Sequence, residues 1–340
     1  MTQIYELKDK IVRFHAEYEV YLAYVYKFIV AFVLFCLINV KIGFMERITE
    51  LPVSLILALV CSLLPKGMTL FVAAVLVTLH LNVLSMEVAL AAILIFVMMF
   101  FVYFRFAPKD GMLVSITPIL HVIGIPYIAP IATGLLSNVY SVAAVICGTI
   151  AYYFVEGIYQ NVVLLQTTAT KAGMDVAKAT VSLEQLLANK EMYLTVAVFT
   201  IVSIVVHIVR KMNIDHAWKV SILVGTLVQI SALLTGYLVF DIQGRWIAML
   251  IGSIVSGVLA LGIEFIFMDL DYTRTERVQF EDDEYYYYVK AVPKRNVTVK
   301  EKTITQFADF PHFGKKKKTE TVISKKDIVE ELGISEEDLK

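Results

Sequence analysis

The stretch PKDGMLVSITPILHVIGIPYIAPIATG, residues 108–134, decides the fold of this chain. It is apolar enough to lie at membrane depth, yet it contains four prolines (Pro108, Pro118, Pro126 and Pro130) and three glycines. A proline inside a helix removes a backbone hydrogen bond. Irregular backbone within a bilayer is tolerated only where it is buried in protein or lines a watery cavity. The segment 111–134 is therefore where we expect a functional site.

The composition around this segment is that of a membrane protein. Of the 340 residues, 58% are hydrophobic and 18% are charged, and the mean hydropathy is +0.72. Soluble domains carry about 25% charged residues. The net charge of −1 gives no reason to expect a nucleic-acid partner. Cys36, Cys61 and Cys147 lie singly in apolar runs, so they predict neither a disulfide framework nor a metal site.

The transmembrane domain is predicted to cover residues 25–268 as an all-α polytopic bundle. A helix needs about 20 apolar residues to cross about 30 Å of hydrocarbon. The sequence contains apolar runs of this kind at 25–43, 68–84, 87–105, 137–155, 192–210, 217–239 and 245–268. One further run, 52–65, is shorter and begins and ends with proline. Together, the long runs and this shorter one give about eight spans, in addition to the proline-rich segment.

The basic residues orient the spans, because cytoplasmic loops are rich in lysine and arginine. If 111–134 crosses the membrane once, the amphipathic N-terminus 1–24 lies outside with its lysines. If 111–134 enters and leaves on one side, both termini become cytoplasmic and most loops obey the rule. We therefore predict a re-entrant hairpin in a plasma membrane protein. The alternative, in which 111–134 crosses twice as two short helices, leaves the same orientation.

Polar side chains near the broken segment are the candidate lining of a substrate or ion path. They are Thr117, His121, Thr133 and Asn138, beside the carbonyls freed at Pro118 and Pro126, with His80 as a possible partner from another span. Polar groups at membrane depth are costly and face a partner or a cavity. The alternative is that each residue only hydrogen-bonds a neighbouring helix.

Two regions outside the spans carry further predictions. The extracytoplasmic loop 156–191 is predicted to be amphipathic helix interrupted at Gly173. The tail contains a β-hairpin module over 269–308, in which two β-rich runs flank an acidic turn and 296–305 supplies a third strand. A basic linker and a short terminal helix follow over 309–340. Residues 273–340 are thus a candidate docking region for a cytoplasmic protein.

A stripe of small residues in the last span predicts close helix packing, either within the chain or in a homo-oligomer. Its members are Gly252, Ser253, Ser256 and Gly257. We find no P-loop, no nucleophile motif and no paired carboxylates within a span, so the sequence predicts neither an enzyme nor a cofactor-binding or metal-binding protein.

The stretch from Asp271 to Lys294 contains Tyr-Thr-Arg-Thr-Glu, an acidic turn, a tyrosine run and Val-Lys-Ala-Val-Pro-Lys. It resembles the juxtamembrane tail of uncharacterised polytopic membrane proteins of Firmicutes. The resemblance covers this tail segment only and implies no activity.

Two functional hypotheses follow. The first is a transporter or permease with a path for a small polar solute or an ion at 111–141. The second is a cell-envelope scaffold or assembly factor, which does not transport and recruits cytoplasmic partners through its tail. The absence of a carboxylate in the middle of any span argues against the first hypothesis in its cation-coupled form.

Overall fold

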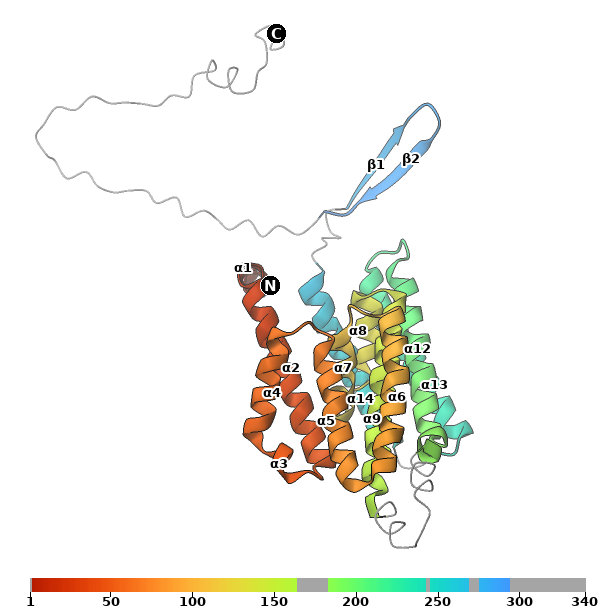
Figure 1. Cartoon of the computed structure of the whole chain (residues 1–340). Helices are drawn as coiled ribbons and strands as arrows, with labels where there is room; N and C mark the ends of the chain where they lie inside the picture. The colour runs from red at the N-terminus through yellow and green to blue at the C-terminus, as the bar shows by residue number, and fades with distance from the viewer. Residues whose placement is uncertain (1, 164–182, 243–244, 269–274, 294–340) are drawn as a thin grey trace, which may run out of the picture. The chain divides into compact units, whose positions relative to one another are not determined.

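The computed structural model describes residues 2–163, 183–242, 245–268 and 275–293. Most of this chain forms a bundle of helices that run up and down between two ends (Figure 1). We call the ends the α1 end and the α3 end, after the short helices found there. The helices are α1 (Thr2–Glu17), α2 (Glu19–Ile42), α3 (Glu46–Thr49), α4 (Leu51–Leu63), α5 (Met68–Leu84), α6 (Met86–Phe106), α7 (Gly111–Ile123), α8 (Ile128–Leu136), α9 (Val142–Gln160), α12 (Lys190–Arg210), α13 (Ala217–Val239) and α14 (Trp246–Phe267).

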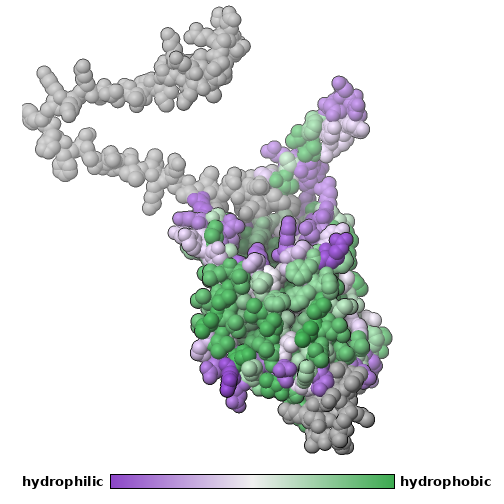
Figure 2. Space-filling view, viewed as in Figure 1, coloured by the Kyte–Doolittle hydropathy of each residue, from purple (hydrophilic) through white to green (hydrophobic). Residues whose placement is uncertain are grey.

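Length and apolarity mark the bundle as a membrane domain. Among the described residues, six helices are long and apolar enough to cross a membrane: α2, α6, α9, α12, α13 and α14. Helices α4, α5 and α7 are apolar but shorter. Figure 2 shows a hydrophobic band between hydrophilic ends, and many large apolar side chains on the surface are exposed, such as Phe101 and Ile247. This agrees with the predicted polytopic helical protein.

Hydrogen bonds fix the helix ends against one another. At the α1 end, the Lys27 ammonium donates to the carbonyls of Ser62 and Leu64 at 3.3 and 2.9 Å, which ties the start of α2 to the end of α4. At the α3 end, Asn39 donates to Ser54 Oγ at 2.9 Å, which ties the end of α2 to the start of α4. Helix α4 therefore lies antiparallel to the part of α2 between Lys27 and Asn39.

The bundle contains two separate hydrophobic cores. The first is built by α2, α4, α5, α6, α7 and α9, around Phe35, Tyr103 and Phe154. The second is built by α8, α12, α13 and α14, around Ile131 and Val202. A small third cluster of Ala129, Val145 and Phe199 joins α8, α9 and α12 between them. We call the two parts the first and second half-bundle, and their contact the junction.

The tail forms the predicted hairpin. Strands β1 (Glu276–Glu281) and β2 (Tyr286–Ala291) pair antiparallel, with Val278 opposite Val289. In the turn, the Asp282 carboxylate accepts hydrogen bonds from the backbone N–H groups of Glu284 and Tyr285 at 2.9 and 2.7 Å and from the Tyr287 hydroxyl at 2.8 Å. These donors hold the pKa of Asp282 below its ordinary value, because they stabilise the charged form.

Several predictions fall outside the described residues. They concern the interruption at Gly173, the third strand at 296–305, and the linker and terminal helix at 309–340. The first residues of the predicted loop 156–191 instead continue α9, which ends at Gln160.

Candidate functional site: the broken segment at the junction

Residues 111–136 form two short helices instead of one long one. Helix α7 has 13 residues and α8 has 9. At 1.5 Å per residue, α7 covers only about 20 Å. Gly124 ends α7 in the left-handed conformation, with φ of 88°, which glycine adopts without steric cost. Pro126 follows two residues later, and Pro130 lies in the first turn of α8, where a missing N–H is tolerated. The glycines and prolines of the sequence thus place the break at 124–127.

Both flanks of the broken segment lie at the same end of the bundle. The Cα atom of Gly67, in the loop between α4 and α5 at the α1 end, is 3.0 Å from where a Cβ on Gly111 would lie. At the other flank, the carbonyl of Ser137 accepts from Arg210 at 3.5 Å, and Arg210 ends α12 at the α1 end. The chain therefore goes down along α7, turns at 124–127 and returns along α8 (Figure 1).

The break divides the segment between the two half-bundles. Val114 and Ile119 of α7 belong to the first core, whereas Ile131 and Leu135 of α8 belong to the second. Glycines permit the close approach on each side. A Cβ on Gly148 of α9 would lie 2.6 Å from the Thr117 Cβ, and the Cβ of an alanine at Gly134 of α8 would meet Val206 of α12. The turn at 124–127 therefore takes the chain from the first core to the second.

His121 lies at the junction with one ring nitrogen unused. Its side chain is buried, and Nδ1 lies 3.0 Å from the carbonyl of Thr117. The ring stacks on Tyr152 of α9 at 4.5 Å between centroids and also contacts Phe199 of α12 at 5.9 Å. Nε2 has no hydrogen-bond partner within the described part of the chain. A buried polar atom without a partner needs an explanation, such as a ligand or a water.

A row of polar groups leads from the junction toward the α3 end. The phenol groups of Tyr127, at the turn, and Tyr237, on α13, are electrostatic neighbours of each other and of the Glu191 carboxylate. Glu191 in turn accepts two hydrogen bonds from Arg245 at 3.1 and 3.2 Å. We call these four residues the tyrosine row.

A second polar contact crosses the junction close to His121. The Tyr153 hydroxyl of α9 lies 3.1 Å from Thr195 Oγ1 of α12, and both residues are buried. The ring of Tyr153 is in edge-to-face contact with His121 at 5.9 Å. Sequence reasoning missed the tyrosines because an aromatic residue in an apolar span gives no signal of its own. For Tyr237, its position near the α3 end of α13 was the available hint, since tyrosine is enriched near membrane interfaces.

The candidate residues of the sequence fall in different places. Thr117 and Thr133 are buried on either side of the turn, and each hydroxyl donates at 2.7 Å to the carbonyl four residues earlier in its own helix. Asn138 follows α8 at the α1 end and is exposed. Pro118 lies inside α7, where it leaves the Val114 carbonyl without a helical donor, and Pro126 is buried in the turn.

His80 does not join this group. Its Nδ1 accepts from the backbone N–H of Met45 at 3.2 Å, and its Nε2 lies 2.9 Å from Asn39 Oδ1. Both partners are at the α3 end of α2, so His80 fixes the α2–α3 corner within the first half-bundle. The hydrogen-bond partners of His80 are thus on α2 and beside α3, whereas His121 stacks on Tyr152 of α9.

The small-residue stripe of α14 packs inside the chain. Gly252 lies against the Tyr127 ring, Gly257 against Thr226, and Ser253 Oγ accepts from Gln229 at 3.4 Å. Ser253 and Ser256 are fully buried. A homo-oligomer would therefore need a different surface.

Comparison with protein families, curated proteins and solved structures finds no match to this chain. Within the described ranges, no group of three or more His, Cys, Asp or Glu residues could hold a metal ion. The site is thus defined by the broken helix, His121 and the tyrosine row alone.

Proposed function

We propose that this integral membrane protein is a transporter, with a path for a small polar solute or an ion along the junction between its half-bundles. The observation that carries the proposal is the broken segment, whose two helices pack into two different hydrophobic cores. In many transporters, sites lie at interrupted helices between two bundles, and one bundle rocks against the other around the site. A scaffold needs no such division.

The polar groups at the junction support a path on the α3 side. His121 Nε2 has no partner among the described residues, and the tyrosine row continues from the turn to the Glu191–Arg245 pair. A solute or a chain of water molecules at the turn would find hydroxyl and imidazole groups there. The row contains no carboxylate at mid-depth, so we propose no cation-coupled pump.

We further propose the topology. Helices α2, α4, α5, α6, α9, α12, α13 and α14 would cross the membrane, which makes eight spans. The segment 111–136 would be re-entrant from the cytoplasmic face, and the α1 end with both termini would be cytoplasmic. A membrane-impermeant thiol reagent added outside should then label a cysteine at position 173 and not one at position 109. The reverse result would invert the orientation.

The test of transport is whether the half-bundles move relative to each other. Spin labels would be placed on exposed residues near the α3 end, Val83 on α5 and Val239 on α13, whose exposed fractions are 54% and 73%. The control pair is Val83 with Val40 on α2, which is 79% exposed and lies within the first half-bundle. Distances would be measured by pulsed electron paramagnetic resonance in lipid nanodiscs.

We expect two populations of distance for the pair across the junction and one for the control pair. A single narrow distance for both pairs in every lipid composition would contradict transport. The scaffold hypothesis then becomes the better one, and it predicts that removal of residues 309–340 abolishes function while replacement of His121 by alanine does not.

A further inference from the structure

Helix α1 has an apolar face that the bundle does not cover. Leu7, Ile11 and Phe14 follow the i, i+4, i+7 spacing that places side chains on one side of a helix. Their exposed fractions are 59%, 53% and 55%. We call these three residues the apolar face of α1. With 16 residues, α1 is not among the helices long and apolar enough to cross a membrane, so another surface must cover this face.

Helix α1 runs across the bundle axis. The Lys8 ammonium donates to the carbonyl of Met268, the residue after α14, at 2.9 Å and lies 5.1 Å from the centre of the Phe265 ring. Helices α2 and α14 are about 36 and 33 Å long, so the start of α2 and the end of α14 reach similar heights at the α1 end. Lys8 precedes α2 by several helical turns and still meets α14 there. Helix α1 therefore lies in the plane of the bundle end, where Figure 1 shows it end-on.

The contact of Lys8 fixes the rotation of α1. Its side chain is directed sideways, to the end of α14. The apolar face is centred about a quarter turn from Lys8, and Ala16 lies on the opposite side of the helix. One of these two sides therefore points along the bundle axis toward the hydrophobic band, and the other points away from it. Ala16 is exposed between the exposed Arg13 and Glu17, so the apolar face is the side that suits the band.

The surroundings of α1 mark this height as the membrane interface. At the start of α2, Tyr18, Tyr21 and Tyr24 are exposed, and tyrosine is enriched where a membrane meets water. At the end of α14, Ile266 and Phe267 are 49% and 63% exposed. The apolar face of α1 therefore lies beside the lipid-facing surfaces of α2 and α14. An amphipathic helix in such a place buries its apolar side about 5–10 Å into the boundary between head groups and acyl chains.

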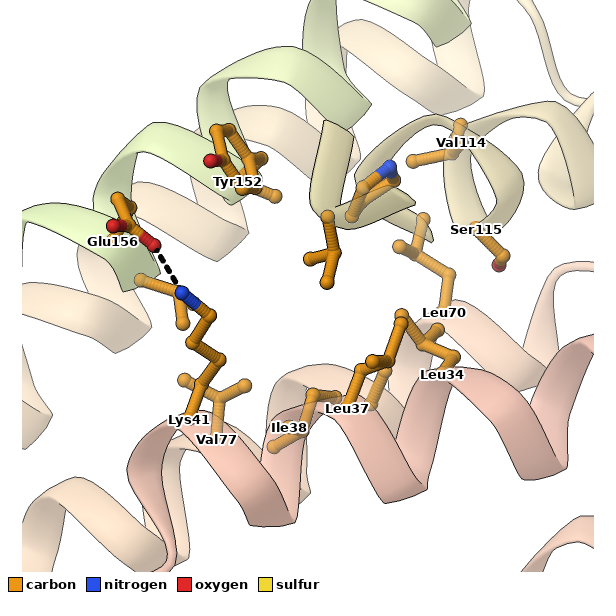
Figure 3. A pocket seen from close by; sticks show the side chains of 15 residues that line it. Leu34, Leu37, Ile38, Lys41, Leu70, Val77, Val114, Ser115, Tyr152 and Glu156 are labelled. Carbon is orange, nitrogen blue, oxygen red and sulfur yellow. Dashed lines mark hydrogen bonds and ion pairs between the residues drawn. The ribbon is translucent and has the colours of Figure 1, made fainter. Parts of the chain in front are cut away.

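The opposite end of α2 is closed within the chain. There, the Lys41 ammonium pairs with the Glu156 carboxylate at 2.8 Å, at the end of an apolar cavity (Figure 3). The cavity has a volume of about 80 Å³, whereas sites for small molecules have about 300–1,000 Å³. It is too small for an acyl chain. Lipid is therefore met on the surface of this half-bundle, as at α1.

We propose that α1 binds the phospholipid leaflet at the α1 end of the bundle, with its apolar face inserted between the head groups and the upper acyl chains. Because Lys8 is bonded to the residue that follows α14, the depth of α1 in the leaflet would also set the height at which the chain leaves the bundle for the tail. This contact is independent of the proposed path at the junction.

The test measures the depth of α1 by tryptophan fluorescence of the full-length protein in phosphatidylcholine vesicles. Phe14→Trp places the reporter on the apolar face, and Ala16→Trp on the opposite side is the matched control. Both proteins also carry Trp218→Phe and Trp246→Phe, which leaves one tryptophan in each. The quenchers are acrylamide in the water and phosphatidylcholine brominated either near the head group or near the chain end.

We expect the emission of Phe14→Trp to be shifted to shorter wavelength relative to Ala16→Trp and to lose its quenching by acrylamide. Bromine near the head group should quench it more strongly than bromine near the chain end, because the helix lies at the interface. A second pair of variants tests the apolar face itself. In the Phe14→Trp protein, Ile11→Gln should reverse the shift, whereas Lys10→Gln, at the neighbouring exposed position, should leave it unchanged.

Equal quenching of Phe14→Trp and Ala16→Trp by acrylamide would overturn the inference, because α1 would then lie in water. So would protection of Phe14→Trp from both acrylamide and brominated lipid, which would mean that protein, such as a second copy of the chain, covers the face. Stronger quenching by bromine near the chain end, or an unchanged emission after Ile11→Gln, would also overturn it. The spin-label distances report on transport separately, so either proposal can fail while the other stands.

Discussion

Replacement of Gly148 by alanine tests whether α7 lies against α9 as described. Both Gly148 and Gly157 lie in α9, so alanine at either position gains the same helix propensity, about 0.8–1 kcal/mol. The packing differs. A Cβ at position 148 would lie 2.6 Å from the Thr117 Cβ and 2.8 Å from the carbonyl oxygen of Val114, whereas a Cβ at position 157 would meet nothing within 4 Å.

The backbone of α7 cannot give way cheaply, because Val114 is fully buried in the first core. An extra methyl group in a packed core costs about 1–3 kcal/mol. Gly157→Ala should therefore stabilise the protein, whereas Gly148→Ala should range from neutral to destabilising by about 2 kcal/mol, a difference of about 1–3 kcal/mol between the two.

The two variants and the wild type would be compared by reversible unfolding in mixed detergent micelles, followed by circular dichroism. If Gly148→Ala is stabilised as much as Gly157→Ala, the close contact between α7 and α9 does not exist. The claim that α7 packs in the first half-bundle would then have no support.

Three further predictions concern the helix ends and the tail. Asn39→Ala should destabilise the bundle by about 1–3 kcal/mol, because it leaves Nε2 of the buried His80 without its partner. Asn138→Ala, at an exposed position, should change stability by less than about 0.5 kcal/mol in the same unfolding assay. Lys41→Gln should cost at most about 1 kcal/mol in that assay, because its ion pair is partly exposed; a larger loss would mean that the pair is structural. The hairpin should lose order as the pH falls through the lowered pKa of Asp282, because this residue stabilises the turn only while its carboxylate is charged. Nuclear magnetic resonance contacts between the two strands would report the loss of order. Asp282→Asn should abolish the transition.

The break at 124–127 could be predicted from the sequence because it depends on local chemistry. Gly124 adopts the left-handed conformation that ends α7, and Pro126 has no N–H to donate to a continued helix. The neighbours of the break could not be predicted in the same way. His80 and His121 are both buried histidines in apolar helices, yet one fixes a corner with Asn39 and the other lies at the junction with Tyr152.

The reason is that a bilayer weakens the pattern that orients helices in water. Both the lipid-facing and the buried sides of a membrane helix are apolar, so the spacing of apolar residues does not show which side packs inward. In α5, for example, the exposed Val83 and the buried Val77 are the same residue type. Burial was decided by close packing, such as the approach that Gly148 allows to Thr117.

The sequence by itself determined the membrane class, the positions of the long helices, the interruption after α7 and the tail hairpin, because hydropathy, length and backbone restrictions act locally along the chain. Only the tertiary structure decided that α7 and α8 belong to different cores and that the tyrosine row extends from the turn toward the α3 end. It also decided that Lys41 meets Glu156 at the end of an apolar cavity. These contacts join residues far apart in the chain, and they depend on the rotation and depth of each helix. Many weak packing contacts set that rotation and depth together, and no single stretch of sequence contains them.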